Sequence, residues 1–76
     1  MLSIRSIPWR RFEKFLLYVG CEFGGIKGDH RKYRKMGIIR PIIIPMRDDL
    51  PVDIIITNLK TLGISREEYL KILETL

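Results

Sequence analysis

The fold is decided by residues 21–45, which read CEFGGIKGDHRKYRKMGIIRPIIIP. Two turn signals, Gly28-Asp29 and Gly37, divide this stretch into segments that lack helical periodicity. Polar and apolar residues alternate in the first segment, and the third is rich in β-branched residues, which is typical of short strands. We predict strands at residues 21–27, 30–36 and 38–45.

Glycine and proline refine this sheet. The Gly24-Gly25 pair interrupts the first strand and predicts a bulge or a bend there. Pro41 lies within the third predicted strand and has no backbone N–H to donate to a neighbour. We therefore place the third strand at an edge of the sheet.

The segment before the sheet predicts a helix. Ser6 and Pro8 supply a start signal, and Gly20 ends an apolar stripe with the spacing i, i+3, i+4, i+7. The stripe consists of Phe12, Phe15, Leu16 and Val19. We expect the polar residues between them, Glu13 included, to face solvent.

A second helix is predicted after the sheet. Pro51 can open it, with Asp49 or Leu50 at the cap position, and Gly63 can end it. β-Branched residues are poor helix formers, so a fourth strand over residues 52–57 stays open as an alternative.

The last helix begins at Ser65, which forms a capping box with Glu68. The order is therefore one helix, three strands and two helices. We predict an α+β fold in which a three-stranded antiparallel sheet carries the helices on one face. Residues 1–76 form a single domain, because the chain is too short for two cores.

Composition excludes several classes of protein. With 46% hydrophobic and 30% charged residues, the chain is globular rather than disordered. One cysteine cannot build a disulfide framework, and one histidine with scattered acids offers no metal site, so we expect no metal and no cofactor. No apolar run approaches the about 20 residues of a membrane helix. We expect a cytoplasmic protein without a membrane partner.

The positive charge is concentrated in one half of the chain. Residues 1–40 carry ten basic and three acidic side chains, a balance of +7. Residues 41–76 carry four basic and six acidic ones, a balance of −2, which recovers the net +5. A cationic stretch of this kind favours binding of a phosphate backbone, although a merely solubilising face has the same composition.

His30 is the single histidine and begins the most basic strand. Alternation places His30, Lys32 and Arg34 on one face of the strand, and Tyr33 on the face toward the core. An imidazole can accept a proton near neutral pH, so His30 could take the proton of a ribose 2′-hydroxyl as a general base. The cations that could hold RNA phosphates are Lys27, Lys32, Arg34 and Arg47.

Short motifs resemble the HicA toxin family over the stretch from Phe12 to about Leu73. They are Lys27-Gly28-Asp29-His30 with Tyr33, Ile42-Ile43-Ile44-Pro45, and Leu62-Gly63-Ile64-Ser65. The resemblance implies a fold like the double-stranded-RNA-binding domain and metal-independent cleavage of mRNA. It also implies that His30 is the catalytic histidine and that a HicB-like antitoxin neutralises the protein.

Two residues depart from the family pattern. Asp29 stands where the motif usually has Ser, and a carboxylate there could orient the imidazole or repel the phosphate. The stretch after Pro45 lacks the second histidine that many members carry. If that histidine acts as general acid, then Arg47, Lys27 or water must replace it here.

An exposed apolar row predicts a partner surface. If Ile42 and Ile44 face the helices, the other side of this edge strand carries Ile39, Pro41, Ile43 and Pro45. We predict that an antitoxin or a second copy covers this row, giving a toxin–antitoxin hetero-oligomer or a homodimer. Two other functions stay open: a non-catalytic RNA-binding module, and an inactive HicA-like homologue.

Overall fold

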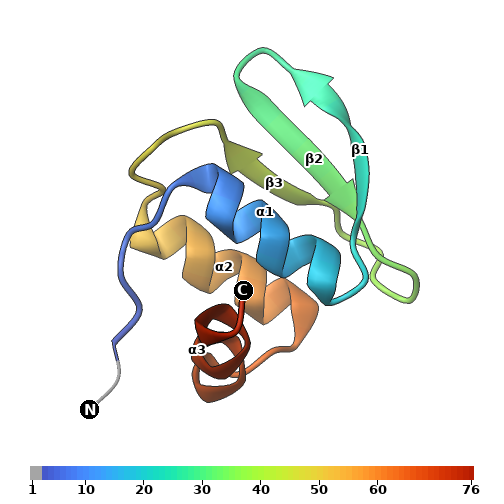
Figure 1. The fold of residues 1–76 in the computed structure, drawn as a ribbon. Helices are drawn as coiled ribbons and strands as arrows, with labels where there is room; N and C mark the ends of the chain where they lie inside the picture. Colours follow the sequence, from blue (N-terminus) through green and yellow to red (C-terminus); the bar gives the residue numbers. More distant parts are fainter. Residues whose placement is uncertain (1–2) are drawn as a thin grey trace.

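A computed structural model describes residues 3–76 and confirms the predicted order of elements (Figure 1). They are α1 (Trp9–Tyr18), β1 (Glu22–Lys27), β2 (His30–Arg34), β3 (Ile42–Pro45), α2 (Val52–Leu62) and α3 (Arg66–Glu74). None of the helices within residues 3–76 has the length and apolar character needed to cross a membrane.

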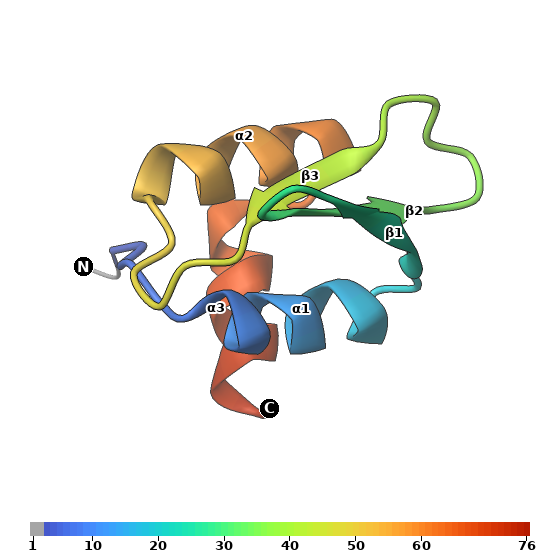
Figure 2. The same cartoon turned by 90° about the horizontal axis from the view of Figure 1, so that it is seen from above.

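The strands form one antiparallel sheet in the order β1-β2-β3. The register shifts between Phe23 and Gly25, which confirms the predicted bulge. The α1 helix packs beneath the sheet, and α2 runs alongside β3 (Figures 1 and 2). β3 is an edge strand as predicted, and the Asn58 side chain of α2 donates a hydrogen bond to its Ile43 carbonyl over 3.3 Å.

The sheet has a covered inner face and an uncovered face, which we call the open face. Alternation along β2 and β3 points Tyr33, Ile42 and Ile44 inward, where all three are fully buried. The apolar stripe of α1 packs below them, and the Phe15 and Tyr69 rings meet edge to face with centroids 4.8 Å apart. This core fixes the sheet and leaves the open face free of helices.

The strand predictions were too long around Gly37. β2 ends at Arg34 and β3 begins only at Ile42, so residues 38–41 are not a strand. The Ile38 N–H donates to the Lys35 carbonyl over 3.0 Å, and Gly37 has a φ of 86°. Residues 35–38 therefore form a turn whose third residue has a positive φ, and after this turn the chain no longer pairs with the sheet until Ile42.

Helix starts were predicted with mixed success. Pro8 and Pro51 are themselves the N-caps of α1 and α2, without a capping side chain. Helix α1 therefore starts at the predicted Pro8 rather than with a Ser6 cap, and the prediction of Asp49 or Leu50 as the cap of α2 was wrong. The Leu50 N–H instead bonds to the Ile7 carbonyl over 2.8 Å.

The predicted start of α3 and end of α2 are confirmed, whereas the alternative of a fourth strand was wrong. The Glu68 N–H donates to the Ser65 hydroxyl over 3.1 Å, as the capping box requires. Gly63 ends α2 with a φ of 71°. The alternative of a strand over 52–57 was wrong, because the α2 helix buries Ile55 and Leu59 on one face against the core.

Candidate nucleic-acid interface

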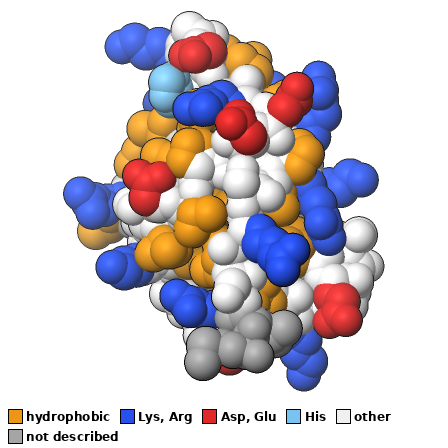
Figure 3. Space-filling view, turned by 90° about the vertical axis from the view of Figure 1, so that its left-hand side faces the viewer, with side chains coloured by type: hydrophobic (Ala, Val, Ile, Leu, Met, Phe, Trp, Pro, Cys, Tyr) orange, Lys and Arg blue, Asp and Glu red, His pale blue; other side chains and the backbone are white. Residues whose placement is uncertain are grey.

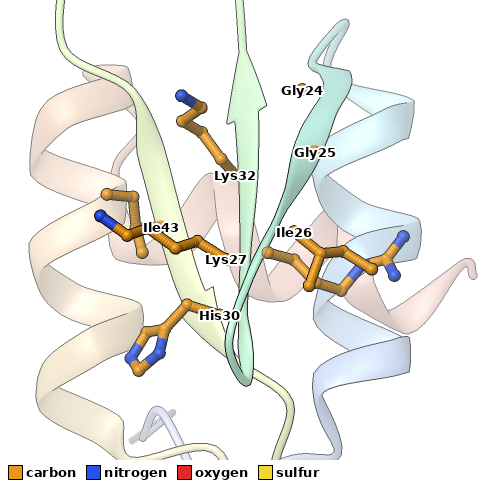
Figure 4. A pocket seen from close by; sticks show the side chains of 8 residues that line it. Gly24, Gly25, Ile26, Lys27, His30, Lys32 and Ile43 are labelled. Atoms are coloured by element: carbon orange, nitrogen blue, oxygen red, sulfur yellow. The ribbon is translucent and has the colours of Figure 1, made fainter.

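The open face gathers four of the predicted site residues, three from the β1–β2 hairpin and Ile43 from β3. Lys27 lies opposite His30 in the register, and Lys32 lies opposite Ile43. The side chains of these four residues line one hollow, which has a volume of about 490 Å³ (Figure 4). The sheet is therefore hollowed where cationic and apolar groups surround the imidazole.

The glycines of β1 create this hollow. A Cβ at Gly24 would lie 3.3 Å from the Lys32 carbonyl oxygen, so a larger residue would press on β2. Gly25 has a φ of 122°, which disfavours any residue with a side chain. With no side chain on either residue, the surface over β1 stays low beside Lys32.

His30 is the first residue of β2 and follows directly on the Gly28-Asp29 turn. Its side chain is 51% exposed, and Nδ1 lies 2.8 Å from the Asp29 Oδ1 atom. A carboxylate only accepts hydrogen bonds, so a neutral His30 holds its proton on Nδ1 and presents an unprotonated Nε2. Figure 3 shows the imidazole at the surface, with Lys or Arg side chains and an acidic side chain near it and hydrophobic side chains below it.

Backbone contacts hold the hairpin tip against β3. The Met46 N–H donates to the Asp29 carbonyl over 2.8 Å, and His30 lies opposite Pro45 in the register. These main-chain contacts of Asp29 and His30 thus fix the position of the imidazole relative to the sheet.

Arg31, one residue further, lies on the inner side of the hairpin. Its Nε donates to the Tyr33 hydroxyl over 3.0 Å, and its Nη2 donates to Glu13 Oε2, also over 3.0 Å. The guanidinium stacks 4.3 Å from the Phe23 ring centroid and 4.8 Å from that of Trp9. These contacts tie β2 to α1.

The same network shifts two pKa values. The hydrogen bond with Tyr33 contributes most to raising the pKa of Arg31, and the Glu13 carboxylate contributes less. Burial, helped by the hydrogen bond to Glu13, raises the pKa of Tyr33 to about 12. The expectation that Glu13 faces solvent was wrong, because its carboxylate accepts from both Arg31 and Tyr33. The sequence does contain a signal for this contact, because an arginine on the core-facing side of a strand needs an acidic partner.

The remaining predicted site residues lie apart from the hollow. Arg34 is at the far end of β2, opposite Glu22. Arg47 follows β3, and its Nη2 lies 3.4 Å from the Asp49 Oδ2 atom. Ile39 lies outside the sheet, so the predicted apolar row of Ile39 and Ile43 along one strand was wrong.

Within residues 3–76, no group of three or more His, Cys, Asp and Glu side chains is arranged to hold a metal ion.

Comparison with known protein families gives a match over most of the chain. A family model described as the HicA toxin of bacterial toxin–antitoxin systems matches residues 9–64 of the 76-residue chain. This stretch runs from the first residue of α1 to beyond α2, and it includes the whole sheet and His30. No curated protein and no solved structure matches the chain.

Proposed function

The chain belongs to the HicA toxin family, the toxin half of bacterial toxin–antitoxin pairs, and we propose that it is a metal-independent endoribonuclease that cleaves cytoplasmic mRNA. One observation carries this proposal. His30 is half exposed on a cationic surface, with Nδ1 held by Asp29 and Nε2 left for a substrate.

In the proposed reaction His30 is the general base. Nε2 takes the proton of a ribose 2′-hydroxyl, and the resulting oxyanion attacks the adjacent phosphorus. The bond from phosphorus to the 5′-oxygen of the next nucleotide breaks. The products are a 2′,3′-cyclic phosphate and a chain with a free 5′-hydroxyl, once the departing oxygen has received a proton.

Lys27 and Lys32 are proposed to hold the reacting phosphate. They line the same hollow as His30, and Lys27 is its direct cross-strand partner. Ammonium groups next to the phosphorus stabilise the negative charge that grows on its oxygens during attack. Arg34 and Arg47 lie further out, so we propose that they bind flanking phosphates.

Lys27 is also the proposed source of the proton for the leaving oxygen, in place of the family's second histidine. It stands beside His30, whereas the Arg47 guanidinium is engaged by Asp49. In addition, a guanidinium does not give up its proton in proteins, which makes Arg47 a poor general acid.

Ile43 gives the antitoxin a contact on this face. It is 46% exposed and lines the hollow with His30. We propose that a HicB-like antitoxin covers Ile43 in a toxin–antitoxin hetero-oligomer and thereby blocks access of RNA to the imidazole. A homodimer through this face would block it in the same way.

The proposal is tested by His30→Ala in a cleavage assay on a purified mRNA, with EDTA present. Loss of a general base lowers the cleavage rate by about 10²–10⁴-fold, while RNA affinity stays within about twofold because a neutral imidazole adds little electrostatic attraction. Lys14→Ala, at an exposed position on α1, is the matched control and should cleave normally. Cleavage that survives in His30→Ala would contradict the proposal.

The clustered cations also favour a second candidate, an RNA-binding module without catalysis. Lys32→Ala should then weaken RNA binding and reduce the slope of log K against log salt by about 1, as it should in an enzyme. The two functions separate on the wild-type protein, because only the enzyme produces cyclic phosphate ends. An inactive homologue would retain antitoxin binding and show no cleavage.

A further inference from the structure

Residues 35–41, which we call the β2–β3 loop, expose two large apolar side chains. Met36 is 98% exposed and Ile39 is 101% exposed. The loop is held by the hydrogen bond from the Ile38 N–H to the Lys35 carbonyl and by the positive φ of Gly37. Because Met36 occupies the tip of this turn, the fold itself presents it to solvent.

Cations surround these apolar side chains. The hollow on the sheet side of the loop is lined by Arg34, Lys35 and Arg40, and Glu22 is the one acid that lines it within residues 3–76. The hollow on the α2 side is lined by Arg40 and Lys60, and no acid of the described part of the chain lines it. The loop is therefore an apolar tip within a positively charged rim.

We infer that the β2–β3 loop docks a segment of the antitoxin in which apolar side chains are flanked by carboxylates. This inference rests on the family assignment, which makes the chain one half of a toxin–antitoxin pair. The positive rim favours an acidic partner, whereas a second copy would bring the same positive charge to the contact. RNA would use the cations but would leave the exposed Met36 and Ile39 without an apolar partner.

The loop is separate from the proposed catalytic hollow. His30 lies at the start of β2 beside the hairpin, while the loop leaves the other end of β2 (Figure 1). The antitoxin would therefore hold the toxin at a second point, where binding does not require His30.

The test measures the affinity for the purified product of the neighbouring reading frame, by titration calorimetry. Ile39→Ser should weaken binding by about tenfold or more, since a buried Ile contributes at least that much. The double variant Arg40→Glu/Lys60→Glu should also weaken binding, and its loss of affinity should grow as the salt concentration is lowered. Leu17→Ser is the matched control, because Leu17 is also exposed but lies on α1; its affinity should stay within about twofold of wild type.

Several results would overturn the inference. They are failure of the wild-type chain to bind this product, equal affinities of Ile39→Ser and Leu17→Ser, and a wild-type dimer that Ile39→Ser converts to monomer in light scattering. A loss of RNA affinity in Ile39→Ser with antitoxin affinity unchanged would assign the loop to RNA and overturn it as well. Circular dichroism and thermal unfolding confirm that each variant folds.

The docking inference and the proposed nuclease activity can fail independently of each other. If His30→Ala leaves cleavage unchanged, the proposed function fails while antitoxin binding can still depend on Ile39. If Ile39→Ser cleaves RNA like wild type but binds the antitoxin equally well, only the docking inference fails.

Discussion

His30 and Arg31 are neighbours in β2, yet their side chains have different partners. His30 points to the open face and has one side-chain hydrogen bond, to the adjacent Asp29. Arg31 points inward, bonds to Tyr33 and Glu13 and stacks on aromatic rings. The inner face of the hairpin thus supplies rigidity, and the open face keeps groups available for a ligand. A side chain that acts on substrate is best placed on a strand whose opposite side is fixed.

The largest effect on this contrast is expected from Glu13→Ala. It leaves the Arg31 guanidinium, which is only 18% exposed, without its acid, and it removes the acceptor of the Tyr33 hydroxyl. We expect the free energy of unfolding to fall by about 2 kcal/mol, measured by urea denaturation. Glu13→Gln should lose less, because it keeps an acceptor.

The adjacent exposed residue on α1 provides the control for this experiment. Lys14→Ala should change the free energy of unfolding by less than about 0.5 kcal/mol. A similar small change in Glu13→Ala would mean that the inner network does not stabilise the hairpin, and the contrast between the two faces would then be lost.

On the open face, Asp29→Ala should affect catalysis rather than stability. The pair with His30 is well exposed, so the free energy of unfolding should change by less than about 0.5 kcal/mol. Without the carboxylate the imidazole loses its preferred tautomer and orientation, and we expect cleavage to slow by about tenfold. The assay compares single-turnover rates at saturating enzyme.

The opposite result would also be informative. If Asp29→Ala cleaves faster and binds RNA more tightly than wild type, the carboxylate acts mainly by repelling phosphate. The hydrogen bond to His30 would then be without catalytic importance.

How far the sequence predicted this arrangement depends on the range of each interaction. The Ser65–Glu68 cap and the end of α2 at Gly63 could be predicted, because they are set by residues close in the chain. The alternation of β2 also placed His30 and Tyr33 on opposite faces correctly.

Interactions between distant segments could not be predicted in the same way. Nothing local to Glu13 indicates that it meets Arg31, 18 residues away. The β-branched residues 54–57 favour a strand locally, and burial of Ile55 in the core decides for the helix. The prediction of a strand over residues 38–41 was wrong for another reason. The β-branched residues there favour a strand, but the turn at Gly37 directs the chain away from the sheet.

The smallest effect concerns the two buried tyrosines, and it depends on pH. Burial raises the pKa of Tyr33 and also that of Tyr69 to about 12, compared with about 10 in an unfolded chain. Below about pH 10 both states keep the phenol protons, so the full stability is present. As the pH rises from about 10 to 12, only the unfolded chain loses them, and stability falls.

The hydroxyls of these tyrosines differ in a way that separates the variants. Tyr33 bonds to Glu13 and Arg31, so Tyr33→Phe should cost about 1 kcal/mol at pH 8. The buried Tyr69 hydroxyl has no partner within residues 3–76, so Tyr69→Phe should leave stability unchanged or raise it. Both variants should lose less stability than wild type between pH 10 and 12, measured by urea unfolding at fixed pH. Equal costs for the two at pH 8 would show that the Tyr33 hydroxyl contributes nothing to the inner network, and the rigidity of the hairpin would have to come from Arg31 and Glu13 alone.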